Sequence, residues 1–286
     1  MKSFLILSTI FLLHISTYGQ NPIKDGEYKE FYPNGNLKMQ GFYKNRKADS
    51  TWIFYFSDGK IFKTGNYKDC LYNLGYIKAL ISVPYDYKWH EKGRENGLWK
   101  IYYPNGLLQT EYQIICGTKV GLEKRFDTTG RIIEESFYSN GNLLSQKEFH
   151  QNGALFRHSL FSYYSVKERK KGNYYLTFSK TAVSEFYENG SLEKIYYEDD
   201  KGYFGEYKEF WENGFLQREA NYKQGEENGV VKEFYENGFL ESETEYKMGK
   251  KHGKSFLLNP DGEVREKQIW KNGVLNKKIK LQTHKK

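Results

Sequence analysis

The sequence has little proline and almost no cysteine or methionine: its 286 residues include 5 Pro, 2 Cys and 3 Met. No apolar run after residue 20 is long enough to cross a bilayer, and the mean hydropathy is −0.82, which excludes a polytopic membrane protein. The patterns His-Glu-x-x-His, Cys-x-x-Cys and Gly-x-Ser-x-Gly are also absent. We therefore expect no metal site, no cofactor and no enzymatic activity.

Aromatic residues and glycine are abundant instead. The chain contains 26 Tyr, 20 Phe, 5 Trp and 27 Gly, and this aromatic content is unlike that of a disordered chain. Lys and Arg outnumber Asp and Glu by 44 to 36, which gives a formal net charge of +8. Lys and Glu alternate along most of the chain, so the basic residues form no continuous track. We expect no nucleic-acid partner.

The N-terminus resembles a secretory signal. Lys2 precedes an apolar run over residues 4–15, and small residues follow up to Gly19. This order of charged, apolar and small residues is typical of a leader that is cleaved, here near Gly19. We expect residues 1–19 to be removed and the mature protein to be exported to the periplasm, the cell surface or the medium. An uncleaved N-terminal anchor is the alternative.

The two cysteines could form a disulfide in an oxidising compartment. Cys70 and Cys116 are separated by about two of the repeats described below. Regular stacking would place four strand spacings, about 19 Å, between them. A disulfide needs Cα atoms within about 7 Å. We therefore expect two unpaired thiols, unless the irregular stretch between them folds back.

A repeat of about 24 residues dominates the chain. Its marker is the glycine of an Asn-Gly or Asp-Gly pair, or of one related Thr-Gly pair, which occurs at Gly35, Gly59, Gly106, Gly130, Gly153, Gly190, Gly214, Gly238 and Gly262. The intervals are 24 or 23 residues except across two irregular segments. Two aromatic residues commonly precede the marker, an aliphatic residue follows it, and a second glycine often lies eleven residues later. Such a repeat indicates stacked structural units.

Two turn signals in each repeat predict two short strands. Asn-Gly favours a tight type I′ turn, and the second glycine then marks a looser turn. We predict an all-β fold: an elongated, single-sheet antiparallel meander of stacked hairpins over residues 20–286. Aromatic and charged residues alternate along the strands, which predicts aromatic ladders between ladders of Glu and Lys. The irregular segments are 70–96, which lacks a turn glycine, and 156–181, which inserts a hairpin with a charged tip.

The repeat resembles a known family. Segments such as 205–216 (GEYKEFWENGFL) and 220–225 (ANYKQG) are similar to the MORN repeat variant, arrays of which characterise the YwqK family of toxin–antitoxin antitoxins. The resemblance implies an elongated sheet of hairpins that has no cofactor and acts by binding another protein. For an antitoxin that protein would be a toxin.

We expect a non-catalytic, exported scaffold that binds a protein partner through exposed aromatic side chains. The candidate contact residues are Trp52, Trp99, Tyr207, Trp211 and Tyr235. For any one of them, packing within the sheet is the interpretation that we favour. The alternative function is a cell-envelope module that binds polysaccharide or anionic lipid through the same face. A hydrolase would need a polar pocket near residues 70–96 or 150–185. The sequence leaves the oligomeric state open.

Overall fold

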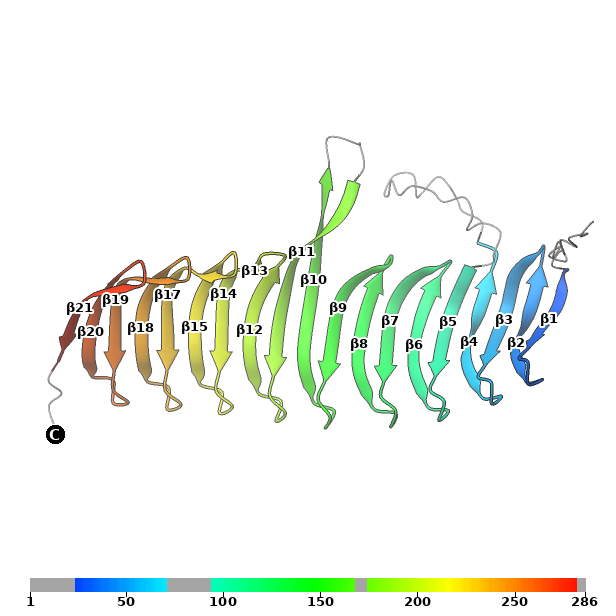
Figure 1. Ribbon diagram of the computed structural model, residues 1–286, viewed down its shortest axis with the longest axis horizontal. Coiled ribbons are helices and arrows are strands. Elements are labelled where there is room, and N and C mark those ends of the chain that lie inside the picture. The colour runs from blue at the N-terminus through cyan, green and yellow to red at the C-terminus, as the bar shows by residue number, and fades with distance from the viewer. Residues whose placement is uncertain (1–23, 71–93, 168–173, 282–286) are drawn as a thin grey trace, which may run out of the picture.

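The computed structural model describes the backbone of residues 24–70, 94–167 and 174–281. It describes their side chains except those within residues 163–179. These residues form one open antiparallel sheet of 21 strands, and none of them is helical. Figure 1 shows the sheet as a long ribbon of strands set side by side. The all-β meander predicted from the repeat is therefore confirmed. The expected leader, residues 1–19, lies outside the described residues.

The strand bounds follow the 24-residue repeat. The strands are β1 (Gly26–Phe31), β2 (Leu37–Lys44), β3 (Lys47–Tyr55), β4 (Ile61–Lys68), β5 (Arg94–Tyr102), β6 (Leu108–Ile115), β7 (Thr118–Phe126), β8 (Ile132–Ser139), β9 (Asn142–Phe149), β10 (Leu155–Lys167), β11 (Tyr174–Phe186), β12 (Leu192–Asp199), β13 (Gly202–Tyr203), β14 (Gly205–Phe210), β15 (Leu216–Lys223), β16 (Glu226–Glu227), β17 (Gly229–Phe234), β18 (Leu240–Lys247), β19 (Lys250–Leu258), β20 (Val264–Lys271) and β21 (Val274–Lys280).

The strands pair in chain order, except that the two-residue strands β13 and β16 are passed over, so that β12 also pairs with β14 and β15 also pairs with β17. The longest hairpin is β10–β11, whose pairing runs from Arg157 opposite Glu185 to Lys167 opposite Tyr174. Its far end projects beyond the other strands (Figure 1). This is the inserted hairpin expected within residues 156–181. Its charged tip, residues 168–173, lies outside the described residues.

The two kinds of turn are the reverse of those predicted. At the first marker, the Tyr32 carbonyl accepts the Gly35 N–H at 2.9 Å. The Tyr32 N–H donates to the Asn36 backbone carbonyl at 2.8 Å. The central turn residues are therefore Pro33 and Asn34, and Gly35 follows them at φ +86°. This is a type I turn with a glycine bulge.

The type I′ geometry occurs at the second marker instead. Asn140 and Gly141 have φ +48° and +80°, and the flanking Ser139 and Asn142 pair directly. A two-residue loop with two positive φ values is a type I′ turn. The prediction failed because Asn-Gly suits both geometries. At the first marker the Asn34 side chain also accepts the Asn36 N–H, at 3.1 Å.

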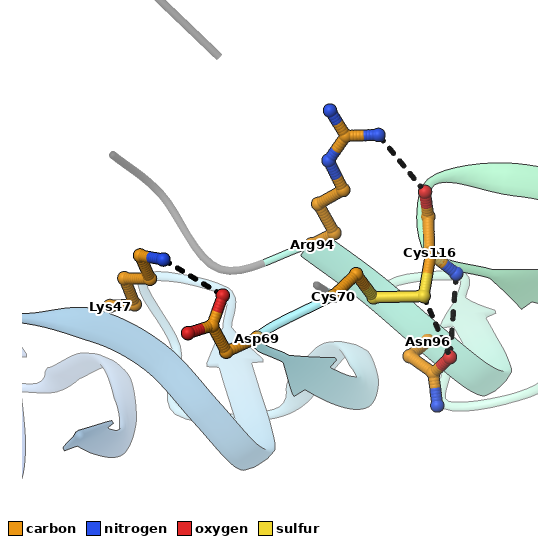
Figure 2. The surroundings of a disulfide bond; sticks show 6 residues. All are labelled: Lys47, Asp69, Cys70, Arg94, Asn96 and Cys116. Carbon is orange, nitrogen blue, oxygen red and sulfur yellow. Dashed lines mark hydrogen bonds and ion pairs between the residues drawn. A yellow bond between two sulfur atoms is a disulfide. The ribbon is translucent and has the colours of Figure 1, made fainter. Parts of the chain in front are cut away.

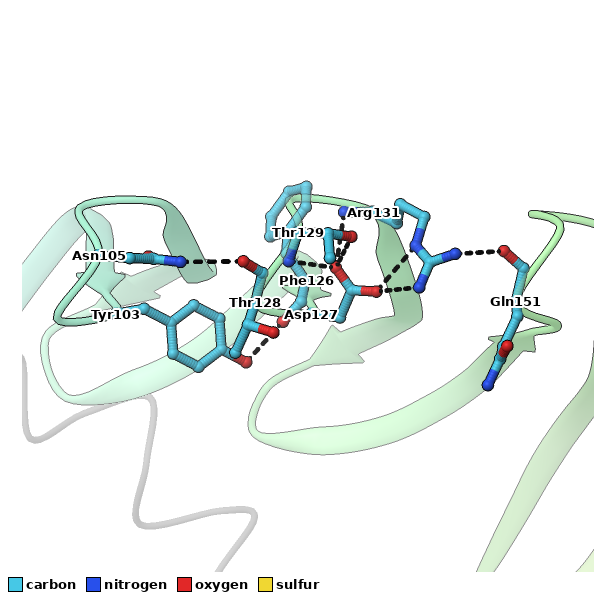
Figure 3. Close-up of polar contacts among 8 residues, drawn as sticks. All are labelled: Tyr103, Asn105, Phe126, Asp127, Thr128, Thr129, Arg131 and Gln151. Carbon is cyan, nitrogen blue, oxygen red and sulfur yellow. Dashed lines mark hydrogen bonds and ion pairs between the residues drawn. The ribbon is translucent and has the colours of Figure 1, made fainter.

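The first-marker turns bond each repeat to the next. Figure 3 shows one such contact, in which the Asn105 amide donates to the Thr128 carbonyl at 2.9 Å and the Tyr103 hydroxyl donates to Phe126 at 2.8 Å. The next turn contains Thr-Gly. It has hydrogen bonds within the turn, and it reaches the following repeat through a different side chain, that of Arg131. There the Asp127 carboxylate accepts the Thr129 N–H, and Arg131 donates to the Gln151 carbonyl at 2.8 Å.

One face of the sheet, which we call the buried face, carries the aromatic ladder. Its rings include Tyr28, Trp52, Tyr67 and Trp99, with centroids 5.2 to 5.8 Å apart for the pairs Tyr28–Trp52, Trp52–Tyr67 and Tyr67–Trp99. The sheet has no second layer, so these rings bury one another. Ion pairs lie on the same face, among them Arg218 with Glu233 at 2.7 Å. Stability therefore comes chiefly from contacts between neighbouring repeats.

The expectation of two unpaired thiols is wrong. Cys70 and Cys116 form a disulfide with Cα atoms 5.7 Å apart, shown in Figure 2. The error lay in the number of strands between them. β4 pairs directly with β5, and β5 pairs with β6. Only two strand spacings therefore separate β4, which Cys70 follows, from β6, which Cys116 follows. Cys70 follows β4, and Cys116 lies in the tight turn after β6. Residues 71–93 lie outside the described part of the chain.

Candidate interaction surface

Three of the five candidate contact residues lie in the core of the buried face. Trp52 is 3% exposed, Trp99 0% and Tyr207 8%. Trp99 packs against Tyr112 and Ile114, and Tyr207 packs with Val183, Tyr196, Ala220 and Val231. These side chains hold the sheet together and present almost no surface to a partner.

The other two candidates are half-buried and bond to the following repeat. The Trp211 indole N–H donates to the Phe234 carbonyl at 3.1 Å, and the Tyr235 hydroxyl donates to Leu258 at 2.9 Å. They occupy the position of Tyr103 in Figure 3. All five aromatic side chains therefore contribute to packing or to hydrogen bonds within the sheet.

The opposite face of the sheet, the exposed face, carries a different set of large side chains. We call them the apolar row, and their exposed fractions are Leu98 51%, Leu122 44%, Phe137 46%, Leu160 50% and Tyr197 40%. The strand register aligns four of these side chains from β7 to β12, with Ser145 of β9 between Phe137 and Leu160. Leu122 lies opposite Phe137, and both Leu160 and Tyr197 lie opposite Ala182.

Sequence reasoning missed the apolar row, although a signal was present. Leu98 and Leu122 each follow the glycine that lies nine residues before a turn glycine. At the same position other repeats carry Glu27, Glu206 or Lys254. Val230, which is 40% exposed, occupies the same position nearer the C-terminal end, so aliphatic residues there are not confined to the middle of the array.

Alternating charges flank the apolar row. On the exposed face Lys100 lies opposite Glu111, and Glu135 lies opposite both Lys124 and Lys147. Because the two signs alternate from strand to strand, this part of the face has no strong field of either sign. An apolar strip bordered by mixed charges has the composition of a protein–protein interface.

A groove lies at one end of the apolar row, at the foot of the β10–β11 hairpin. Its volume is about 420 Å³, and Leu160, Tyr197 and Phe204 contribute to its lining. Lys180 Nζ lies 4.7 Å from the centre of the Phe204 ring, and the Tyr197 and Phe204 rings are 5.8 Å apart. The lining residues include neither His nor Cys. The lining combines these apolar side chains with the polar side chains of Ser162, Lys180 and Glu206.

The tyrosines of the buried face are held neutral. Burial raises the pKa of Tyr67 to about 12, and it raises the pKa values of Tyr112, Tyr196 and Tyr207 as well. A hydroxyl that keeps its proton can donate a hydrogen bond, as Tyr196 does to Glu185 at 2.9 Å. These groups are therefore suited to packing and hydrogen bonding and poorly suited to acid–base chemistry near neutral pH.

The described residues contain neither a candidate metal site nor a candidate membrane-spanning helix. They hold no group of three or more His, Cys, Asp or Glu side chains placed to bind a metal ion. They likewise hold no helix with the length and apolar character needed to cross a membrane.

Comparisons with solved structures find only distant similarity. The chain is 12% identical to a chain of the TcdB2-TccC3 complex, with a TM-score of 0.21, and the match covers 85% of this chain and 12% of that one. It is 10% identical to a porin-like protein from Bacteroides uniformis, with a TM-score of 0.20 and coverage of 90% and 94%. Scores this low support no inference. No curated protein sequence matches.

The family comparison agrees with the repeat. Seven segments match the MORN repeat variant: residues 24–45, 48–69, 95–113, 119–140, 132–151, 205–224 and 227–248. Most of them correspond to a strand pair and the first-marker turn between its strands. The resemblance to this repeat is therefore confirmed over these segments. The repeat and the single-sheet fold suggest a non-catalytic scaffold, and the chain carries an array of MORN-variant hairpins.

Proposed function

We propose that this protein is an exported, non-catalytic scaffold that binds a protein partner through the apolar row. The observation that carries the proposal is the exposure of Leu98, Leu122, Phe137, Leu160 and Tyr197 on one face of a rigid sheet. Leu122 and Phe137 lie directly opposite each other, and Leu160 and Tyr197 flank Ala182 on the same face. Exposed apolar side chains gathered on one face commonly mark an interaction site.

The disulfide supports export. Disulfides persist in oxidising compartments and are rare in the cytosol. The Cys70–Cys116 bond accords with the leader expected at residues 1–19. N-terminal sequencing of the mature protein should show that it begins near Gln20. A mature chain that begins at Met1 and accumulates in the cytosol would contradict export.

The resemblance to YwqK-type antitoxins favours a toxin as the partner. Co-expression with an adjacent toxin-like reading frame tests this part of the proposal: the wild-type scaffold should restore growth and co-purify with the toxin. Growth arrest that persists in spite of co-expression would argue against an antitoxin role. Binding of another protein through the apolar row is tested separately, by substitution of Leu122 and Phe137.

Charge placed in the apolar row should abolish partner binding. The test variant is Leu122→Asp with Phe137→Asp, two neighbours on adjacent strands that are 44% and 46% exposed. A matched control is Lys124→Gln with Glu135→Gln, which changes the neighbouring charged row on the same two strands without placing like charges opposite each other. Pull-down from envelope extract, followed by sedimentation of the reconstituted complex, should show a stoichiometric protein partner that the control retains and the test variant loses.

Two outcomes would overturn the proposal. One is equal retention of the partner by the test variant and the control. The other is retention of the scaffold on purified envelope polysaccharide or anionic vesicles with no stoichiometric protein partner, which would favour the envelope-module alternative. Circular dichroism of both variants checks that the sheet is intact.

A further inference from the structure

The two ends of the sheet have different free edges. Among the described residues, β1 pairs only with β2, and β21 pairs only with β20. Each therefore presents a row of unpaired backbone groups. An unpaired edge is a template for another strand, and proteins commonly protect such edges with lysines.

β21 has this protection and β1 does not. Lys277, Lys278 and Lys280 lie on β21, where every residue is exposed. Two β21 strands could approach only by bringing these lysines together. β1, with the sequence GEYKEF, carries exposed residues of both signs, Glu27 and Lys29. Its charge pattern permits pairing with an identical strand.

The hydrogen bonds of the first turn show which groups of β1 point outward. The Tyr32 N–H bonds across to Asn36, so the backbone groups of Tyr32 face β2. Because these groups alternate in direction along a strand, those of Tyr28 and Glu30 also face β2. The N–H and C=O groups of Glu27 and Lys29 therefore point away from the sheet.

We propose that β1 is an interface with a second copy of this chain. The two β1 strands pair antiparallel about a two-fold axis that passes between the two copies of Tyr28. In this register Glu27 of each copy lies opposite Lys29 of the other, and the outward-pointing groups of these residues form the hydrogen-bonded pairs. The interface extends the sheet across both molecules, and it is separate from the apolar row.

Charge selects this register. Sliding the strands by one hydrogen-bonded step in either direction would place Lys29 opposite Lys29 or Glu27 opposite Glu27. Like charges directly opposite on a sheet are destabilising, whereas opposite charges stabilise the pair. Each shifted register contains one such conflict, whereas the register centred on Tyr28 has none and forms two favourable pairs.

The buried face also continues across this register. Tyr28 already contacts Tyr43 and Trp52, with ring centroids 5.3 and 5.8 Å away. The second Tyr28 would lie at the next position of the aromatic ladder. Each copy would therefore cover the end of the ladder in the other, where a single chain leaves it open.

Head-to-tail stacking of copies by simple translation fits less well. An even number of antiparallel pairings separates β1 from β21, so these two strands run in the same direction. Stacking by translation would join them in a parallel pair and would produce an open-ended fibre. The two-fold pairing of β1 instead gives a closed dimer with the antiparallel geometry found throughout the sheet.

Sedimentation of the mature full-length chain over a range of concentrations tests the proposal. Wild type should show a reversible monomer–dimer equilibrium. Glu27→Lys or Lys29→Glu alone should weaken the dimer roughly tenfold, since each change creates two like-charge pairs. The double variant E27K/K29E restores opposite charges in the homodimer and should recover its affinity. Lys29→Pro removes an outward N–H and should abolish the dimer while keeping the β1–β2 bonds.

Disulfide trapping tests the register. Facing residues in a non-hydrogen-bonded pair have Cα atoms about 4.5 Å apart, within disulfide range. Tyr28→Cys should therefore give a covalent dimer on oxidation, whereas Glu30→Cys, which would face Gly26 of the second copy, should not. A wild-type chain that stays monomeric at all concentrations would overturn the proposal. So would a dimer that is indifferent to both the charge reversals and Lys29→Pro.

Discussion

Gly65 is the residue that lets Trp99 lie flat on the sheet. A Cβ atom at this position would lie 2.0 Å from Trp99 Cδ2, and Gly41 has the same relation to Trp52, at 2.1 Å. Neither glycine has the positive φ of the turn glycines, so the requirement is for space. The absent side chain makes room for an indole ring that is completely buried although the sheet has a single layer.

Gly65→Ala should lower the free energy of unfolding by about 1–3 kcal/mol, the usual cost of overpacking a core. In a Trp99→Leu background the same change should cost much less, because the clashing ring is gone. Urea unfolding of the four proteins in this double-mutant cycle gives the coupling energy. Equal costs in both backgrounds would show that steric contact with Trp99 is not the cause.

At the scale of the element, the unit is a hairpin whose two ends differ. The first-marker turn bonds forward to the next repeat, as Asn213 does to the Glu236 carbonyl at 2.9 Å. The second-marker turn bonds backward, as the Gly117 N–H does to Glu95 at 2.9 Å. At the start of the array the Asp25 carboxylate accepts the Arg46 N–H at 2.8 Å, and this bond lowers the Asp25 pKa. The Asp25 carboxylate therefore takes the role that a backbone carbonyl has at the corresponding turns of later repeats, such as Lys119 for Gly141.

The disulfide should stabilise its neighbouring hairpins without being needed for the tight turn. Cys116 has φ +50° in this turn, a conformation that Asn140 adopts in the next one. The variant Cys70→Ser with Cys116→Asn removes the cross-link and keeps a residue suited to the turn. We expect a loss of about 2–4 kcal/mol, measured by urea unfolding, because the unfolded chain gains freedom.

Reduction of the wild-type protein is the matched control for this variant. Dithiothreitol should lower the urea midpoint of wild type to that of the variant and leave the variant unchanged. A wild-type midpoint that does not respond to reductant would contradict a stabilising role for the disulfide.

Over the whole molecule, tyrosines run along the buried face from repeat to repeat. Burial raises the pKa of Tyr67, Tyr112, Tyr196, Tyr207 and Tyr222. In the unfolded chain a tyrosine loses its proton near pH 10. The folded sheet thus binds more protons than the unfolded chain above that pH, and stability falls as the pH rises.

We therefore expect the stability that Tyr67 contributes to be fully present below pH 10 and to be lost as the pH rises to about 12, its folded pKa. Phenolate absorbance and the unfolding midpoint, followed together, should change cooperatively. Tyr67→Phe removes one titrating group and should make the decline shallower. Tyrosines that titrate near pH 10 while the sheet stays folded would contradict this account.

Much of the architecture follows from local sequence. The glycine marker, the paired aromatics and the second glycine recur with the period of one hairpin, and they predicted strands, turns and a single sheet. These signals are local because a tight turn depends on the φ preferences of a few neighbouring residues, and a strand on the alternation of its side chains. The family resemblance rests on the same residues.

The surface and the cross-link depended on the assembled sheet. Trp99 and Leu98 are adjacent and apolar, and they point to opposite faces of the sheet. The assembled sheet buries Trp99 and leaves Leu98 exposed. Cys70 and Cys116 meet because β4 pairs directly with β5 across a long stretch of chain, which spacing alone could not show. Which face is covered, and which distant residues become neighbours, is decided by strand pairing, and pairing is a property of the whole sheet.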